Sequence, residues 1–404
     1  MLRTNPGGQM RVLFAGLSSI GHFFPLLPLA TAISRHGHHV GYAIDAGLHG
    51  RVAALGLEPV AAGMSMPAAF EEAAHHVFGR PVRIADLRPE QIPGYLAVVF
   101  GSVLPRRYAD DLEVALRRFR PDLLVYDAVC PGAGIAAVAV GVPALAHGLG
   151  HRTLTQLSPE YVSRVRDFAA ERKLRLDLTD PNPLGHPYLD IYPPSMQDPD
   201  FVAGARRVEL RPVPHVDDAH PLPPLPASTG HRPRVYVTFG TEAGAEGASA
   251  AIRETVAGLA VLDATVLVAT GPKLPVDVLG APPDNVIVRP WVAQAAVLPH
   301  LELVVSHAGS GTMLGALAKG LPQLLLPRGV DQFVNADAVL AAGAGERLLP
   351  EELTASAVAA SARRLLAEPT FRASARRVAD EIAAMPGPDE IADHLPDILA
   401  QLTA

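Results

Sequence analysis

The chain has 404 residues, a length that predicts two or three domains at about 150 residues each. Apolar residues make up 49% and charged residues 19%, which is typical of a globular protein and excludes a disordered chain. The net charge is −7 and the basic residues form no long block, so we expect no nucleic-acid partner. The single cysteine, Cys130, excludes an intrachain disulfide and a multi-cysteine metal site.

One N-terminal stretch has the charge pattern of a signal peptide, because Arg3 and Arg11 precede an uncharged run from Val12 to Ile33. Serine, glycine and proline residues interrupt that run, so we interpret it as a strand, a loop and a helix. No other stretch reaches the roughly 18 uninterrupted apolar residues of a membrane span. We therefore expect a cytoplasmic protein without a membrane span.

In the first half of the chain, short apolar runs alternate with helical patterns. The runs that predict strands are RVLFAG (11–16), HHVGYAI (38–44), LLVY (123–126) and VPALAH (142–147). Helical patterns follow at 25–37, up to Gly56 and from about Gly132. This alternation predicts a parallel sheet covered on both faces. Residues 64–110 and 149–210 have weak periodicity, and we interpret them as excursions that supply specificity.

A Pro-rich stretch without hydrophobic period, Arg211 to Arg234, predicts an interdomain linker. A second alternation follows it, with predicted strands at 235–239, 265–270, 285–288, 301–307 and 323–327 and helices near 246–260 and 311–319. We therefore expect one domain at 1–215, a linker at 216–232, a second domain at 233–385 and a C-terminal helical segment at 386–404.

Polar and small residues follow each predicted strand of the second domain, where ligands of open parallel sheets bind. They are Gly240 and Thr241, Gly271, Trp291, the run HAGSGT (307–312), and Asp331 with Gln332. The backbone N–H groups of Gly309 to Thr312 would lie at a helix N-terminus, which favours a diphosphate. His307 would donate one more hydrogen bond, so the set predicts a nucleotide-sugar site.

In the first domain, His22 lies in the loop after the first strand. Two aspartates flank the strand LLVY: Asp127 follows its carboxyl end, whereas Asp122 lies roughly 16 Å back at ~3.3 Å per residue. Only Asp127 can share the sheet edge of His22.

We searched the sequence for three other ligand-binding motifs: a dinucleotide-binding pattern, a P-loop and a DxD sequence. The run Gly132 to Ala137 fits a dinucleotide pattern, but no acidic residue follows near Arg152, so we interpret its small residues as helix packing. There is no GxxxxGK[ST] loop. Asp198-Pro199-Asp200 is a DxD sequence that we interpret as a chance match in a Pro-rich excursion.

Together, GHFFP (21–25), Trp291 with Gln294, and the blocks 307–327 and 329–336 resemble GT-B glycosyltransferases. The likeness is to the bacterial natural-product branch of the family that includes plant flavonoid glucosyltransferases and UDP-glucuronosyltransferases, and it covers essentially the whole chain. The resemblance implies an α/β fold of two Rossmann-like, doubly wound parallel-sheet domains facing across a cleft. It also implies that the acceptor binds the N-terminal domain, that the donor binds the C-terminal domain, and that the C-terminal helix packs back on the N-terminal domain.

The resemblance implies a role for each matching residue. His22 is the general base that Asp127 orients. The other roles are donor diphosphate binding by His307, Gly309, Ser310, Gly311, Thr312 and Thr241; nucleoside binding by Trp291, Val292 and Gln294; and donor-sugar binding by Asp331 and Gln332. For the aromatic residues of the excursions, two interpretations stay open, acceptor binding and core packing; these residues are Phe78, Tyr95, Phe100 and Tyr108. The motif that usually reads Trp-x-Pro-Gln is here Trp291-Val292-Ala293-Gln294.

The implied reaction is an inverting, metal-independent transfer of a sugar from a dTDP- or UDP-sugar co-substrate to a hydroxylated apolar natural product, with no cofactor. Some relatives bind both ribose hydroxyls with a Glu where this chain has Gly315, so we expect a dTDP-sugar, and a deoxysugar in particular. The expected partners are these two small molecules, and the chain is a monomer or homodimer.

Two alternatives remain: a nucleotide-sugar epimerase of the same fold, and a non-catalytic auxiliary protein that binds a nucleotide sugar. An epimerase needs no acceptor, and the GHFFP loop argues against it. The intact His22, Asp127 and HAGSGT run argue against an auxiliary role.

Overall fold

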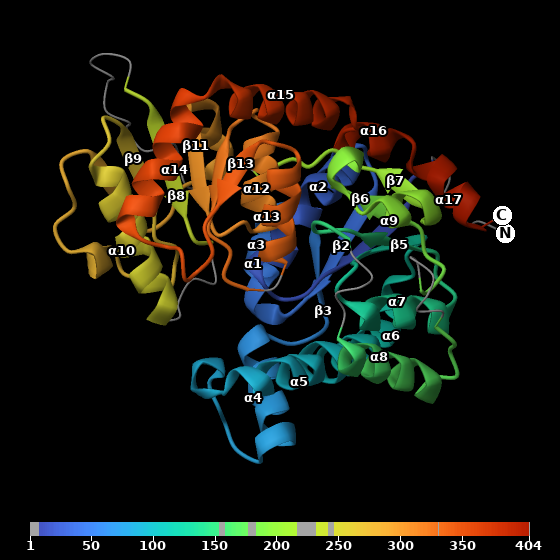
Figure 1. The fold of residues 1–404 in the computed structure, drawn as a ribbon. Coiled ribbons are helices and arrows are strands. Elements are labelled where there is room, and N and C mark those ends of the chain that lie inside the picture. The colour runs from blue at the N-terminus through green and yellow to red at the C-terminus, as the bar shows by residue number, and fades with distance from the viewer. Residues whose placement is uncertain are drawn as a thin grey trace. The chain divides into compact units, whose positions relative to one another are not determined.

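The structure, a computed structural model, describes residues 8–152, 158–176, 183–215, 232–240, 246–329 and 331–403. The chain divides into two compact units (Figure 1). Unit 1 comprises Met1–Ile191, Asp198–Leu210 and Pro386–Ala404, and unit 2 comprises Tyr192–Gln197 and Arg211–Met385. Of the expected linker at 216–232, only Arg232 lies within the described residues.

The described part of unit 1 is built on a seven-stranded parallel sheet of order β3-β2-β1-β4-β5-β6-β7. Its strands are β1 (Arg11–Ala15), β2 (His39–Ile44), β3 (Glu58–Ala61), β4 (Leu123–Asp127), β5 (Ala144–His147), β6 (Tyr188–Asp190) and β7 (Arg207–Glu209). β4 is buried along its whole length, as expected for a strand covered on both faces. The strand order reverses between β1 and β4, which makes their carboxyl ends the topological switch point.

The helices of unit 1 are α1 (Ile20–Phe23), α2 (Leu27–Arg35), α3 (His49–Ala54), α4 (Met66–Phe78), α5 (Ile92–Val98), α6 (Leu104–Phe119), α7 (Pro131–Val140), α8 (Pro159–Glu171), α9 (Pro199–Gly204), α16 (Pro388–Asp393) and α17 (Leu395–Thr403). A π-helical turn, Val99–Val103, joins α5 to α6. The small residues of α7 serve packing, as predicted: a Cβ added at Gly132 would lie 2.2 Å from the carbonyl oxygen of Pro105 in α6.

The two segments of weak periodicity are more regular than their sequence indicates. Residues 64–110 form α4, α5 and the start of α6, and residues 149–210 contribute α8, α9 and the strands β6 and β7. Each of these strands has three residues, too few to show a period of two. Asp198 of the DxD sequence caps α9 by accepting the backbone N–H groups of Asp200 and Phe201 at 2.9 and 3.1 Å, in line with a chance match.

The end of the chain belongs to unit 1, where α16 packs against α2. Arg35 of α2 forms an ion pair with Asp389 at 2.9 Å. His36, directly after α2, contacts Asp389 at 3.2 Å and Asp393 at 2.8 Å. Polar contacts on the surface therefore accompany the packing of these helices.

The described part of unit 2 contains a six-stranded parallel sheet of order β10-β9-β8-β11-β12-β13. Its strands are β8 (Arg234–Thr238), β9 (Thr265–Ala269), β10 (Val286–Arg289), β11 (Leu303–Ser306), β12 (Gln323–Leu325) and β13 (Gly345–Arg347). Its helices are α10 (Glu246–Ala260), α11 (Gln294–Val297), α12 (Ser310–Leu317), α13 (Gln332–Ala341), α14 (Ala355–Ala367) and α15 (Pro369–Ala384).

Helices cover both faces of this sheet (Figure 1). Val235 and Val237 of β8 pack in the cluster that includes α10 and α14, whereas Tyr236 packs on the opposite face with α11 and α12. This period of two is the one expected of a strand. The order again reverses at a central pair, β8 and β11. The predicted pair of doubly wound parallel sheets is confirmed.

Among the described residues, the helices include none with the length and apolar character to cross a membrane.

Candidate active site

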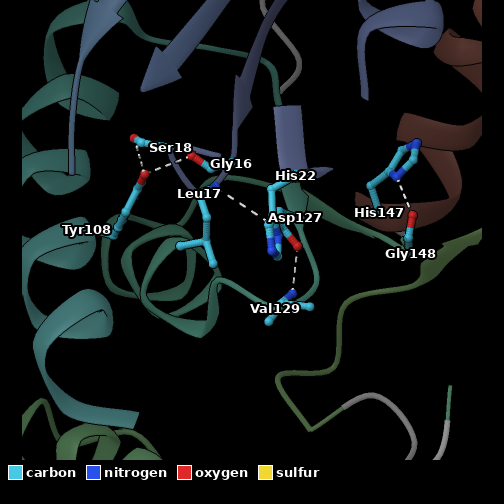
Figure 2. Close-up of polar contacts among 9 residues, drawn as sticks. All are labelled: Gly16, Leu17, Ser18, His22, Tyr108, Asp127, Val129, His147 and Gly148. Atoms are coloured by element: carbon cyan, nitrogen blue, oxygen red, sulfur yellow. Dashed lines mark hydrogen bonds and ion pairs between the residues drawn. The ribbon is translucent and has the colours of Figure 1, made fainter. Parts of the chain in front are cut away.

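His22 and Asp127 meet at the switch point of unit 1 (Figure 2). His22 lies in α1, directly after the loop that follows β1, and Asp127 is the last residue of β4. Nδ1 of His22 is 2.7 Å from Oδ2 of Asp127. The Asp127 side chain has no exposed surface, whereas 24% of the His22 side chain is exposed. The structure therefore brings together the two residues that the sequence predicted at this edge.

Backbone amides hold the Asp127 carboxylate in place. Oδ1 accepts the N–H of Val129 at 2.8 Å, and Oδ2 lies 3.5 Å from the N–H of Leu17. Because Nδ1 of His22 faces an ionised carboxylate, the neutral imidazole keeps its hydrogen on Nδ1 and its lone pair on Nε2. The pair has the arrangement of an oriented general base.

The β1–α1 loop that carries His22 is tied down by Tyr108 of α6 (Figure 2). The Tyr108 hydroxyl donates to the carbonyl oxygen of Gly16 at 2.8 Å and lies 3.0 Å from Oγ of Ser18. Gly63 makes room for this ring, because a Cβ there would come within 2.2 Å of it. Tyr108 is fully buried, so it supports the loop from the protein interior.

His147 is a neighbour of Asp127 that sequence reasoning missed. It ends β5 and is the register partner of Asp127 in the sheet. Its Nδ1–H donates to the carbonyl oxygen of Gly148 at 2.7 Å. Burial lowers the pKa of His147 to about 4, so its ring is neutral at pH 7. Its position at the end of a strand was the signal that could have found it.

The three aromatic residues expected at the acceptor lie in and beside the α4–α6 region. Tyr95 is 1% exposed, and its hydroxyl donates to the carbonyl oxygen of Phe70 at 2.6 Å. Its ring centroid lies 5.7 Å from that of Phe78, and Phe70 links it to Phe100. Phe78 and Phe100 are partly buried against the same core. Tyr95 packs in the core, and an acceptor role for all three residues stays a prediction.

In unit 2, His307 follows β11 and its ring lies between two glycines. A Cβ added at Gly240 would lie 2.7 Å from Nε2 of His307, and one at Gly309 would lie 2.5 Å from the same atom. Gly240 also has a φ of +81°, a conformation that favours glycine. Burial lowers the pKa of His307, and the carboxylate of Asp331 opposes this shift.

Helix α12 begins directly after this turn. Its N-cap is Gly309, which has no side chain to accept the first backbone N–H groups of the helix. These groups and the positive end of the helix dipole form the kind of site that binds phosphate. Thr241, the other residue predicted to contact the diphosphate, lies outside the described residues.

The side chains around α12 form two hydrogen-bonded pairs. Gln294 donates from Nε2 to Oγ1 of Thr312 at 2.9 Å, so the Thr312 hydroxyl faces Gln294. Ser310 donates from Oγ to Oδ2 of Asp331 at 2.9 Å. The structure therefore connects predicted nucleoside, diphosphate and sugar residues around one helix.

The remaining residues predicted to bind the donor are Trp291, Val292 and Gln332, which take no part in these two hydrogen-bonded pairs. Trp291 follows β10 and is partly buried, and Val292 is buried in the core beneath α11. Gln332 accepts the backbone N–H of Arg328 at its Oε1 atom at 2.8 Å. Asn335 lies in the block 329–336 that carries the resemblance, but the sequence predicted no role for it; it is fully buried and hydrogen-bonded to both Ser310 and Asp331.

The comparisons with known proteins agree with this architecture. Residues 253–398 match the family model described as "Erythromycin biosynthesis protein CIII-like, C-terminal domain". The chain is 35% identical to the elloramycin glycosyltransferase ElmGT of Streptomyces olivaceus, over 96% of this chain and 97% of the relative. It is 29% identical to the TDP-daunosamine transferase DnrS of Streptomyces peucetius, over 97% of each chain.

A solved structure extends the likeness to the fold. The crystal structure of the glycosyltransferase SnogD from Streptomyces nogalater matches with a TM-score of 0.71 and 26% identity, over 97% of this chain and 99% of that chain. Two Rossmann-like parallel-sheet units with this likeness define a GT-B glycosyltransferase.

The chain belongs to the family of antibiotic glycosyltransferases that contains ElmGT. It is therefore a transferase that depends on a nucleotide sugar. The comparisons give no support to an epimerase or to a non-catalytic auxiliary protein.

Proposed function

We propose that this enzyme transfers a deoxysugar from a dTDP-sugar to a hydroxyl group of an apolar natural product, with inversion at the anomeric carbon and His22 as the general base. The observation that carries the proposal is the 2.7 Å contact between Nδ1 of His22 and the buried carboxylate of Asp127. A neutral imidazole oriented in this way can remove the proton of an acceptor hydroxyl while the carboxylate stabilises the imidazolium that forms.

In the proposed step, the acceptor oxygen forms a bond to the anomeric carbon as its proton moves to Nε2 of His22. The bond between the anomeric carbon and the diphosphate oxygen breaks, and its electron pair leaves with the nucleoside diphosphate. Attack on the face opposite the leaving group inverts the configuration. Unit 1 supplies the base, and unit 2 supplies the groups that stabilise the negative charge on the leaving group.

Charge stabilisation without a metal ion is supported by the turn at His307. The backbone N–H groups that begin α12 and the ring of His307 are the hydrogen-bond donors available to a diphosphate. We therefore infer that the reaction is metal-independent and that no cofactor takes part.

The choice of dTDP over UDP is supported by Gly315 in α12. In relatives that select ribose, a Glu at this position binds both ribose hydroxyls. Here a Cβ at Gly315 would lie 3.1 Å from Cδ1 of Leu298, which is tighter than an ordinary contact, and 3.5 Å from Cγ of Pro214. The name of the relative DnrS, a TDP-daunosamine transferase, supports a TDP-linked donor for this chain.

Three measurements test the proposal. Calorimetric titration should give a lower dissociation constant for dTDP than for UDP, and a preference for UDP would contradict the nucleoside assignment. The anomeric proton coupling in the NMR spectrum of the product should report inversion relative to the donor. Addition of EDTA should leave the rate unchanged, and a rate that collapses and recovers with Mg²⁺ would overturn metal independence.

A further inference from the structure

Asn335 in α13 is a fully buried amide at the centre of the turn that precedes α12. Its Nδ2 lies 3.0 Å from each of three acceptors, which are the carbonyl oxygen of Ala308, Oγ of Ser310 and Oδ2 of Asp331. Ser310 in turn donates to the same Asp331 oxygen at 2.9 Å. One side chain therefore connects the backbone of the turn, the first residue of α12 and the residue that caps α13.

The backbone that Asn335 holds has an uncommon conformation. Ala308 has a φ of +64° and is fully buried. A residue with a Cβ is strained in this sparsely populated region, and the conformation persists only where its surroundings hold it there. The hydrogen bond from Asn335 to the Ala308 carbonyl is one such restraint, because it fixes the orientation of the peptide plane between Ala308 and Gly309.

The amide oxygen of Asn335 has a hydrogen-bond partner in Tyr192. The Tyr192 hydroxyl donates to Oδ1 of Asn335 at 3.3 Å, and Tyr192 is fully buried. Because the Ala308 carbonyl and the Asp331 carboxylate can only accept, the amide nitrogen faces them, and the amide oxygen accepts from the Tyr192 hydroxyl.

Tyr192 itself is anchored in unit 2, although it precedes the second domain by more than 40 residues of sequence. It begins the segment Tyr192–Gln197, whose 3₁₀ turn Pro194–Met196 packs against α13. The backbone N–H and the Oγ of Ser195 donate to the carboxylate of Glu381 in α15, at 2.8 and 2.5 Å.

We propose that Asn335, supported by the Tyr192 hydroxyl, is a positioning residue for the donor. It holds the His307–Ser310 turn in the conformation that binds the diphosphate before the diphosphate arrives. This inference rests on the proposed function, in which that turn binds the donor. The Tyr192 hydroxyl reaches the turn through its hydrogen bond to Asn335, so we treat the two side chains as one unit.

Two substitutions and their combination test this coupling, with dTDP as the probe and the dissociation constant as the readout. Asn335→Ala should weaken dTDP binding by about 10- to 100-fold, because the turn loses several hydrogen bonds and relaxes. Tyr192→Phe removes one hydroxyl and should weaken binding by about 2- to 10-fold. The double variant should bind no more weakly than Asn335→Ala alone. Additive losses, or unchanged affinity in a folded Asn335→Ala protein, would overturn the proposal.

Gln323 provides a matched control for loss of a buried amide. It is fully buried in β12, and its Nε2 donates to the carbonyl oxygen of Met313 in α12 at 3.1 Å. Gln323→Ala removes the same kind of hydrogen bond from the same helix but leaves the turn untouched. It should lower the melting temperature while the affinity for dTDP stays within about 2-fold of wild type. An equal loss of affinity in Gln323→Ala would mean that Asn335 acts only through general stability.

Hydrogen exchange in the unliganded protein separates this inference from the proposed function. The backbone amides of 309–313 should exchange faster in Asn335→Ala and Tyr192→Phe than in wild type, and at the wild-type rate in Gln323→Ala. If wild type binds neither dTDP nor UDP while these rates change as described, the donor assignment fails and the positioning of the turn stands. Unchanged exchange rates in both variants would refute the positioning.

Discussion

The switch points of the two units present different chemistry at the same place in a parallel sheet. Unit 1 concentrates its chemistry in one pair of side chains, a partly exposed His22 against the buried carboxylate of Asp127. In unit 2 the polar groups at the switch point are the backbone N–H groups that begin α12 and the ring of His307, against which two glycines pack closely. Removing one proton requires a single base at a defined position, whereas a diphosphate carries its charge over many oxygens and needs many donors. Substitutions should therefore affect turnover in unit 1 and affinity in unit 2.

The largest expected effect comes from His22→Ala. Loss of a general base should lower kcat by about 10²- to 10⁴-fold and leave the dissociation constant of dTDP nearly unchanged. Turnover under saturating substrates and titration with dTDP check the two parts. His75→Ala, at an exposed position near the end of α4, is the matched control and should keep wild-type turnover. Full activity in His22→Ala would remove this residue from the mechanism.

A second effect in unit 1 concerns stability rather than turnover. His147 has a pKa of about 4 when folded and about 6.5 when unfolded, so the unfolded chain binds more protons between these values. The contribution of His147 to the free energy of unfolding should therefore be undiminished above about pH 6.5. The free energy of unfolding should fall by up to about 3 kcal/mol as the pH drops to 4.

His147→Gln tests this linkage, because an amide can still donate to the Gly148 carbonyl but does not titrate. Denaturant unfolding at pH 7 and pH 4.5 should show a smaller loss of stability in the variant than in wild type. His75→Gln, an exposed histidine, should retain the wild-type loss. Identical pH dependence in wild type and His147→Gln would show that His147 titrates normally.

In unit 2, His307→Ala should weaken dTDP binding itself. The loss of one hydrogen-bond donor to a charged group corresponds to about 10- to 100-fold in the dissociation constant. Titration calorimetry measures it directly. Unchanged dTDP affinity would mean that His307 does not contact the diphosphate.

The smallest effect expected in this series is that of Gly309→Ala, which tests the fit around the ring of His307. The added Cβ would lie 2.5 Å from Nε2, so the imidazole must move, and dTDP affinity should fall by about 10-fold. Gly50→Ala is the control, because its Cβ would meet no atom within 4 Å. Wild-type affinity in Gly309→Ala would show that the ring position is not critical.

Much of this arrangement follows from local sequence pattern. The alternating runs predict most strands because buried parallel strands are continuous apolar segments, as β4 is. The pairing of His22 with Asp127 was predictable because both follow strands, and strand ends share one edge of the sheet. Residues 307–312 are predicted to form a binding site for the same reason, because they too follow a strand of a parallel sheet.

Other features depend on contacts that the sequence pattern does not encode. β6 and β7 have three residues each, and only their neighbours in the sheet identify them as strands. The local pattern around Asn335 predicts only a polar residue in a helix. Its proposed role as a positioning residue depends on its hydrogen bond to Ala308, whose backbone conformation is uncommon. Tyr192 lies 143 residues away from Asn335 in the chain, so no local pattern connects them.

The unit boundaries also bear on how this enzyme can be recombined with its relatives. Residues Tyr192–Gln197 belong to unit 2 and Pro386–Ala404 to unit 1, so neither unit is one continuous piece of the chain. A chimaera spliced within 211–234 would pair the Tyr192 segment of one parent with the α13 of the other, and the last helices of one parent with the α2 of the other. Under the proposed function, exchange of donor specificity between family members therefore calls for transplanting the Tyr192 segment with the rest of unit 2, while the C-terminal helices stay with unit 1.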